Sequence, residues 1–154
     1  MAGYTLRILS VQEEPRMENE LFSMGKERFS LSVTAIQLSD LLTQTPEDLI
    51  NQYDVIVIDR RRASPTIPQK LSVKLRELRK CDIDILMLIT ERDFTLFEIL
   101  EEYSTSGHNL NYLLDPINQK EFNAIMQRKV RMGQLKQFLA ETDQIAKQLS
   151  DLGA

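Results

Sequence analysis

The sequence predicts an α/β fold in which helices cover both faces of a parallel sheet. Five short apolar runs alternate with amphipathic stretches along the chain of 154 residues, and the connections between them are short. A strand followed by a helix and then by another strand forms a crossover, which favours parallel pairing. The third run, Asp54–Ile58, is a continuous and mostly β-branched series, which is typical of a strand buried on both faces. The order of these segments therefore indicates an open parallel sheet.

Each apolar run is interpreted as one strand. The second run alternates apolar and polar residues, as an edge or half-buried strand does. The expected strands, in chain order, are Tyr4–Val11, Phe29–Ala35, Asp54–Ile58, Ile85–Ile89 and Tyr112–Leu114, the last preceded by Leu110.

Helices are expected between the strands and after the last one. Pro15 stands where a helix can begin, because the first turn needs no hydrogen bond from that nitrogen. Leu71, Leu75 and Leu78 recur at helical spacing. Asn118 is interpreted as a helix cap, with Glu121 three residues later. The expected helices cover residues 15–28, 38–52, 67–80, 94–104 and 118–150.

The last expected helix is too long for the domain that it closes. Large apolar residues recur along it at alternating steps of three and four, with one threonine among them: Leu135, Phe138, Thr142, Ile145, Leu149 and Leu152. Such a seam is typical of a coiled coil, so we expect the helix to protrude and to form a parallel homodimer. The alternative is that the helix folds back on its own domain. We divide the chain into a domain, 1–130, and a helical linker, 131–154, that leads toward a further domain.

Composition excludes several classes of function. Hydrophobic residues make up 42% of the chain and charged residues 27%, which are ordinary globular values. A net charge of −4 disfavours binding to nucleic acid or acidic lipid. One cysteine and one histidine exclude an internal disulfide framework and a cysteine-rich zinc site. No apolar run reaches membrane-spanning length, so we expect a cytoplasmic protein without a membrane contact.

In an open parallel sheet, functional side chains gather where the strands end. Glu13 lies just after the first strand, and Asp59 directly follows the third. Thr90 follows the fourth strand, and Asp115 follows the fifth. Carboxylate oxygens together with water suit Mg²⁺, so Glu13 and Asp59 are candidate ligands of this ion. The alternative is that these residues are merely polar strand ends.

Four segments in this order resemble the receiver domain of bacterial response regulators. They are RILSVQEEP, DVIVIDRRRAS, ILMLIT and YLLDPI, and the resemblance covers about Tyr4 to Val130. It implies a flavodoxin-like fold with three layers, α/β/α, and a five-stranded parallel sheet in the order 2-1-3-4-5. It also implies a role in two-component signalling, with a histidine kinase or a phosphotransfer protein as partner.

The resemblance assigns a role to several residues. Asp59 matches the aspartate that accepts a phosphoryl group, and Glu13 matches one member of the acidic pair that holds Mg²⁺. The backbone carbonyl of Arg61 matches a further metal ligand. Thr90 matches the hydroxyl that turns toward the phosphoryl group, and Tyr112 matches the aromatic residue that follows this change.

Three positions depart from the family pattern. Gln12 replaces the first acidic residue of the metal pair and is at best a weak ligand, because it adds no negative charge. Asp115 replaces a lysine that would stabilise the phosphoryl oxygens, and an aspartate repels them instead. Glu91 follows Thr90, where the family keeps a small residue. The arginines at 60–62 could return positive charge or pair with Asp59, and a solvated loop is favoured for them over a nucleic-acid patch. The pattern is that of a degenerate receiver.

We therefore expect a receiver-like signalling domain that is poorly phosphorylated, is not an enzyme and acts through protein contacts. These contacts are expected on the face formed by the fourth helix, the fifth strand and the fifth helix. The alternative is an ordinary phosphorylatable receiver that uses Asp59 and Mg²⁺. A flavin- or nucleotide-binding protein on the same sheet is a weaker alternative, because the loop from Gln12 to Pro15 is acidic and lacks glycine. The expected further domain is an output module, such as a diguanylate cyclase or a kinase.

Overall fold

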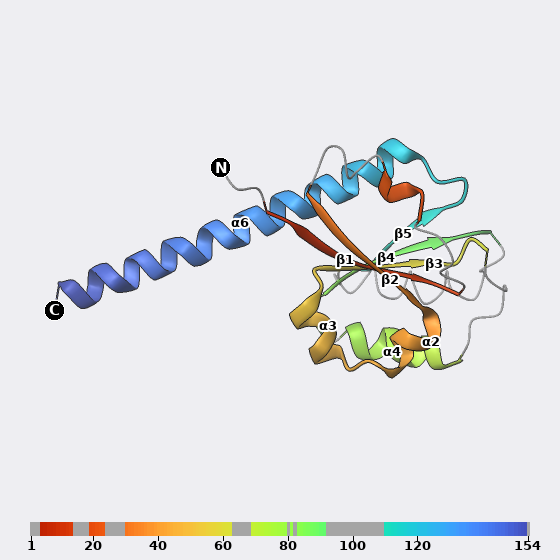
Figure 1. The fold of residues 1–154 in the computed structure, drawn as a ribbon, viewed down its shortest axis with the longest axis horizontal. Helices are drawn as coiled ribbons and strands as arrows, with labels where there is room; N and C mark the ends of the chain where they lie inside the picture. The colour runs from red at the N-terminus through yellow and green to blue at the C-terminus, as the bar shows by residue number, and fades with distance from the viewer. Residues whose placement is uncertain are drawn as a thin grey trace.

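The described part of the chain in the computed structural model forms a five-stranded parallel sheet with the strand order β2-β1-β3-β4-β5 (Figure 1). The structure describes residues 4–13, 19–23, 30–62, 69–79, 81, 83–91 and 110–153. The strands are β1 (Leu6–Gln12), β2 (Leu31–Gln37), β3 (Val55–Asp59), β4 (Asp84–Ile89) and β5 (Leu110–Leu114). The predicted sheet, its order and the edge position of the second strand are confirmed.

The labelled helices are α2 (Leu38–Thr43), α3 (Pro46–Gln52), α4 (Gln69–Arg79) and α6 (Gln119–Leu152). The single helix predicted over 38–52 is wrong, because the chain forms two helices there. Thr45 is extended and caps α3, its hydroxyl accepting a hydrogen bond from the backbone N–H of Asp48 at 3.3 Å. Pro46 disfavours a helical conformation at the residue before it, which separates the two helices. The predicted helix 94–104 lies outside the described residues, and only residues 21–23 of the helix predicted over 15–28 are described as helical.

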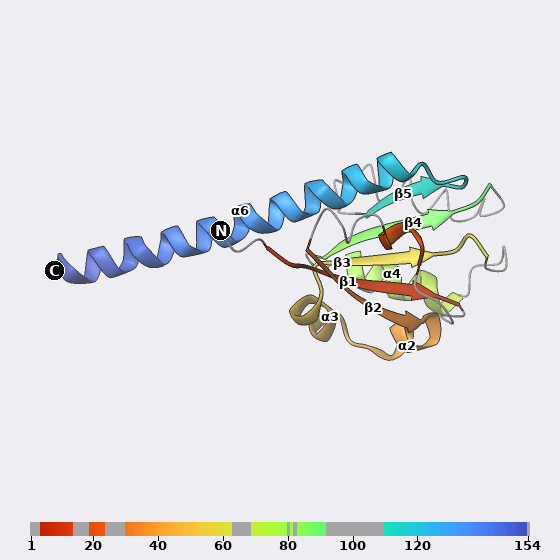
Figure 2. The ribbon, with the colours of Figure 1, turned by 45° about the horizontal axis from the view of Figure 1, so that its top comes forward.

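Helices cover the sheet on both faces, as predicted (Figure 2). On one face, leucines of α2, α3 and α4 pack against β1, β3 and β4. The predicted series Leu71, Leu75 and Leu78 belongs to this core and is fully buried. On the other face lie residues 21–23 and the first half of α6. There the rings of Phe22 and Phe122 meet edge to face, with their centroids 5.3 Å apart.

The strand register positions the residues that follow β3 and β5. Asp59, the last residue of β3, pairs with Leu88 of β4. The backbone N–H of Arg60 donates to the carbonyl of Leu88 at 2.8 Å, and that of Asp115 donates to the carbonyl of Ile89 at 2.8 Å. The hydrogen bonds between neighbouring strands therefore continue one residue past the ends of β3 and β5. They fix the backbone of Arg60 and Asp115 relative to β4.

The predicted protrusion of the last helix is confirmed (Figure 1). Asn118 caps α6, because its side-chain oxygen accepts hydrogen bonds from the backbone N–H groups of Lys120 and Glu121 at 2.9 and 3.2 Å. The last buried residue of this helix is Val130. Beyond it the helix extends away from the domain and leaves these large apolar side chains exposed: Met132, Leu135, Phe138, Leu139, Ile145, Leu149 and Leu152. No helix in the described ranges has both the length and the apolar character needed to cross a bilayer.

The packing of α6 on the sheet can be tested at Phe122. This ring is 1% exposed, so Phe122→Ala should lower the free energy of unfolding by about 3–5 kcal/mol, because it removes buried apolar area and leaves a cavity. Urea denaturation of dilute protein measures the change. The matched control is Phe138→Ala in the same helix, where the ring is 63% exposed and the domain should lose almost nothing. Equal losses in the two variants would contradict the packing described.

Candidate functional site

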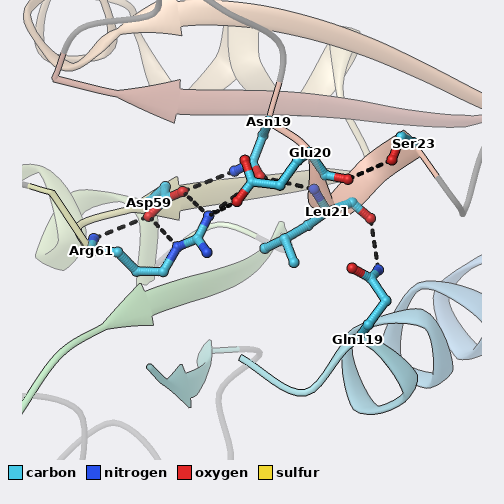
Figure 3. Close-up of polar contacts among 7 residues, drawn as sticks. All are labelled: Asn19, Glu20, Leu21, Ser23, Asp59, Arg61 and Gln119. Atoms are coloured by element: carbon cyan, nitrogen blue, oxygen red, sulfur yellow. Dashed lines mark hydrogen bonds and ion pairs between the residues drawn. The ribbon is translucent and has the colours of Figure 1, made fainter. Parts of the chain in front are cut away.

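The carboxylate of Asp59 receives four hydrogen bonds from described residues at the carboxyl edge of the sheet (Figure 3). The guanidinium of Arg61 spans it, with Nε donating to Oδ1 at 3.0 Å and Nη2 donating to Oδ2 at 2.7 Å. The backbone N–H of Arg61 donates to Oδ1 at 3.0 Å, and Nδ2 of Asn19 donates to Oδ2 at 2.9 Å. A guanidinium that contacts both oxygens is the strongest neutralising partner that a side chain can offer a carboxylate.

The ion pair between Asp59 and Arg61 is largely shielded from water. The side chain of Asp59 is 10% exposed and that of Arg61 is 16% exposed. The hydrogen bond with Asp59 is the main reason that the pKa of Arg61 is raised, with the charges of Asp59 and Glu20 adding to it and burial opposing it. Nη2 of Arg61 also donates to Oε1 of Glu20 at 3.2 Å. Arg61 therefore remains a fixed cation shared by two carboxylates.

Asn19 links this ion pair to the start of α6. Asn19 is buried, and its Oδ1 accepts a hydrogen bond from the backbone N–H of Leu21 at 3.2 Å. Its Nδ2 donates a hydrogen bond to Asp59. The carbonyl of Leu21 accepts a hydrogen bond from Nε2 of Gln119 at 2.9 Å, and Gln119 is the first residue of α6 (Figure 3). A continuous series of hydrogen bonds therefore runs from Asp59 to α6.

Glu13 contacts a second arginine. Its Oε1 lies 3.4 Å from Nη1 of Arg60, whose side chain is only 1% exposed. Gln12, Glu13, Asp59 and Arg60 line one small depression next to the end of β1. The two carboxylates expected to share a site thus border the same depression, but each of them contacts its own arginine.

The carboxylates at this edge are bound by arginine side chains, which leaves them poorly suited to bind Mg²⁺. Both oxygens of Asp59 already accept hydrogen bonds, and Glu13 is engaged by Arg60. Within the described parts of the chain, no three histidine, cysteine or acidic side chains are grouped in a way that could hold a metal ion. The family resemblance assigned the backbone carbonyl of Arg61 to the metal, whereas the structure gives the side chain of this residue a direct contact with Asp59.

The remaining candidate residues lie along the neighbouring strands. Thr90 directly follows β4 and is half-buried, two residues beyond the partner of Asp59 in the register. Tyr112 lies in the middle of β5 opposite Met87 and is 39% exposed. Asp115 is exposed at the end of β5, before Pro116. The register thus places Thr90 and Tyr112 on adjacent strands but at different levels.

Sequence reasoning considered pairing of Asp59 with the arginines beside it, and the structure shows this pairing for Arg61. It favoured a solvated loop for residues 60–62, and the structure corrects this: Arg60 is buried, Arg61 is mostly buried and only Arg62 is exposed. The available signal was charge balance, since carboxylates expected to be close together without a lysine need another cation. For Asn19 the signal was an asparagine just before a short apolar stretch, which is typical of a cap.

Comparison with known proteins supports the fold. No protein-family model and no curated protein matches the chain. A receiver domain from Clostridium thermocellum shares 14% identity, with a TM-score of 0.54 over 84% of this chain and 98% of that one. A response regulator from Colwellia psychrerythraea shares 18%, with a TM-score of 0.57 over 82% and 98%. An adenylate cyclase structure from Rhodopirellula baltica shares 19%, with a TM-score of 0.56 over 94% and 98%. The chain therefore has the fold of the response-regulator receiver domain.

The coupling between Asp59 and Arg61 can be measured with a double-mutant cycle. Arg61→Ala should lower the free energy of unfolding by about 1–3 kcal/mol, because it leaves a largely buried carboxylate with fewer donors. Combined with Asp59→Ala, the total loss should be smaller than the sum of the single losses. Arg62→Ala on the same loop is the control and should stay within about 0.5 kcal/mol of the wild type. Strict additivity in urea denaturation would show that the pair does not interact in solution.

Proposed function

We propose that this chain is a receiver-like signalling domain that acts through protein contacts and accepts a phosphoryl group poorly. The observation that carries the proposal is the grip of Arg61 on both oxygens of Asp59. An aspartate can attack a phosphoryl donor only through a carboxylate oxygen that is free to approach it. Here that approach requires the guanidinium to leave first.

The charges around Asp59 support the same proposal. Arg61 brings a positive charge to the site, as a lysine at position 115 would. This charge is already neutralised by the ion pairs with Asp59 and Glu20. A phosphoryl group would add a charge of about −1.5 to −2 beside Glu20, which shares the same guanidinium. Asp115 adds no compensating charge. The unmodified ion pair is therefore the stable state of the site.

An ordinary phosphorylatable receiver remains the second candidate. It is favoured by the depression that Gln12, Glu13 and Asp59 line together, since this is where a cation and a phosphoryl donor would meet the carboxylates. That function requires both arginines to turn away from Glu13 and Asp59. In either case we assign no enzymatic activity to the chain beyond phosphoryl uptake.

Labelling with acetyl phosphate and Mg²⁺ separates the two candidates. The wild type should label weakly, as measured by the intact mass of the protein. The variant Arg61→Ala/Asp115→Lys should label more strongly, because it frees Asp59 and restores a lysine at position 115. Asp59→Asn in that background should abolish the label, and Arg62→Ala/Asp115→Lys is the control that leaves Arg61 in place. Complete labelling of the wild type that disappears in Asp59→Asn would establish the phosphorylatable candidate instead.

We assign residues 1–130 to the signalling domain and 131–154 to a helical linker toward an output domain. The face around β5 and α6 is proposed as a docking surface for a partner, such as a kinase or a phosphotransfer protein. Tyr112 and Leu114 of β5 are 39% and 41% exposed, so this edge offers apolar area to a partner.

The exposed seam of α6 supports a parallel homodimer. Leu135, Phe138, Ile145 and Leu149 each have about half or more of their surface exposed. Burying a large apolar side chain stabilises a complex by roughly 1.5–3 kcal/mol at most, so a second helix that covers the seam gains several such contributions. Thr142 falls in the seam, and its hydroxyl donates to the carbonyl of Phe138 at 2.9 Å, which satisfies this polar group within its own helix. A modest dimer is therefore expected.

Sedimentation equilibrium tests the dimer. The wild type should approach twice the chain mass of 17.9 kDa as its concentration rises. Leu149→Asp should remain monomeric, because it places a charge inside the seam. Ser150→Asp introduces the same charge one residue later on an exposed position outside the seam and should still dimerise. A wild type that stays monomeric at high concentration would refute pairing through α6.

A further inference from the structure

An aromatic ring lies directly on a glycine where α6 passes the amino edge of the sheet. The ring of Tyr4, just before β1, faces Gly133 of α6. A Cβ atom built on Gly133 would lie 2.6 Å from Cδ1 and 2.7 Å from Cζ of this ring, which is closer than non-bonded carbon atoms can approach. Glycine weakens a helix at an interior position, so this residue costs stability that the close approach explains.

Tyr4 is held in place from its other end. Its hydroxyl lies near Asp54, and burial together with this neighbouring carboxylate raises the pKa of Tyr4 to about 12. Arg7 in turn holds Asp54, with its backbone N–H at 2.9 Å from Oδ2 and its Nη2 at 3.1 Å from Oδ1. Nη1 of Arg7 donates to the carbonyl of Asn51 at 2.9 Å. The ring of Tyr4 therefore lies between Gly133 of α6 and the carboxylate of Asp54, which Arg7 holds in place.

A second contact holds α6 one turn earlier. Nζ of Lys129 lies 3.2 Å from Oδ2 of Asp84, the first residue of β4, and the lysine side chain is mostly buried. Residues four apart lie on the same face of a helix, so Lys129 and Gly133 both face the amino edge of the sheet. Tyr4, Asp84, Lys129 and Gly133 line one cavity of about 110 Å³.

Both contacts lie where the environment of α6 changes. Val130 is the last buried residue of the helix, and the exposed seam begins at Leu135. Every described residue of the helix beyond Gly133 is exposed. Among the described residues, these two contacts therefore hold the helix at its last partly buried positions.

We propose that the contacts Tyr4–Gly133 and Lys129–Asp84 form a two-point clamp that fixes the direction in which α6 leaves the domain. Tyr4 and Lys129 are positioning residues in this arrangement. In a dimer that pairs through α6, the clamp would fix the orientation of each domain relative to the seam. This consequence rests on the proposed function of α6 as the linker helix. The clamp itself is an intramolecular contact and can be tested whether or not the chain is phosphorylated or dimeric.

The experiment is a thermal-unfolding cycle in the full chain. Gly133→Ala should lower the Tm of the wild type, because the added methyl group meets the Tyr4 ring. In a Tyr4→Ala background the same substitution should raise the Tm, because the ring is gone and alanine is the better helix former. The control is Ala140→Gly, which is two turns farther along the exposed part of α6 and should lower the Tm equally in both backgrounds. A rise in Tm on Gly133→Ala in the presence of Tyr4 would overturn the proposal.

A distance measurement tests the direction of the helix independently of stability. Spin labels at Ser32→Cys on β2 and Lys147→Cys on α6, in a Cys81→Ser background, report the angle between the sheet and the helix. Labelled chains are mixed with an excess of unlabelled chains, so that only distances within one chain are observed. We expect a narrow distance distribution that broadens with Tyr4→Ala and broadens further with Tyr4→Ala/Lys129→Met. Distributions that remain as narrow as that of the wild type would show that the clamp does not set the direction of α6.

Discussion

The ion pair between Asp59 and Arg61 is the interaction on which the carboxyl edge of the sheet depends. The parallel register places a carboxylate at the end of a strand that is buried on both faces, where an unpaired charge would be costly. Arg61, two residues later, supplies the opposite charge from the same loop. The pair also organises its neighbours, because Glu20 approaches the same guanidinium and Asn19 approaches the same carboxylate.

The helix α6 connects the carboxyl edge of the sheet with its amino edge. It begins beside the hydrogen bonds that lead from Asp59 through Asn19 and Leu21 to Gln119. It then crosses the sheet antiparallel to the strands and leaves past their amino edge, beside Tyr4 (Figure 2). A rigid helix that touches both edges can transmit a displacement at one of them to the other. The burial of Phe122 and Met126 between these edges keeps the helix on the sheet.

The sequence predicted the fold well and the site only in part, for a physical reason. Strand and helix identities follow from local periodicity, so the buried run of β3 and the leucines of α4 were recognisable. The break at Pro46 was missed because the apolar pattern continues across it, although the proline itself is a local signal. The direction of the Arg61 side chain depends on the geometry of its loop. The contact between Tyr4 and Gly133 joins residues far apart in the chain, and periodicity encodes neither feature.

A domain that keeps its acidic site paired internally can still respond to a partner. A partner shifts a conformational equilibrium only by its difference in affinity for the two states. Under the proposed function, the second state would be one in which Arg61 has left Asp59, and a partner that presents an acidic group to Arg61 would favour that state without any phosphoryl transfer. The hydrogen bonds from Asn19 to Asp59 and from Gln119 to Leu21 would then change together, since they share the segment 19–21. Signalling by docking and signalling by phosphorylation would thus use the same connection to α6 and differ only in what displaces the arginine.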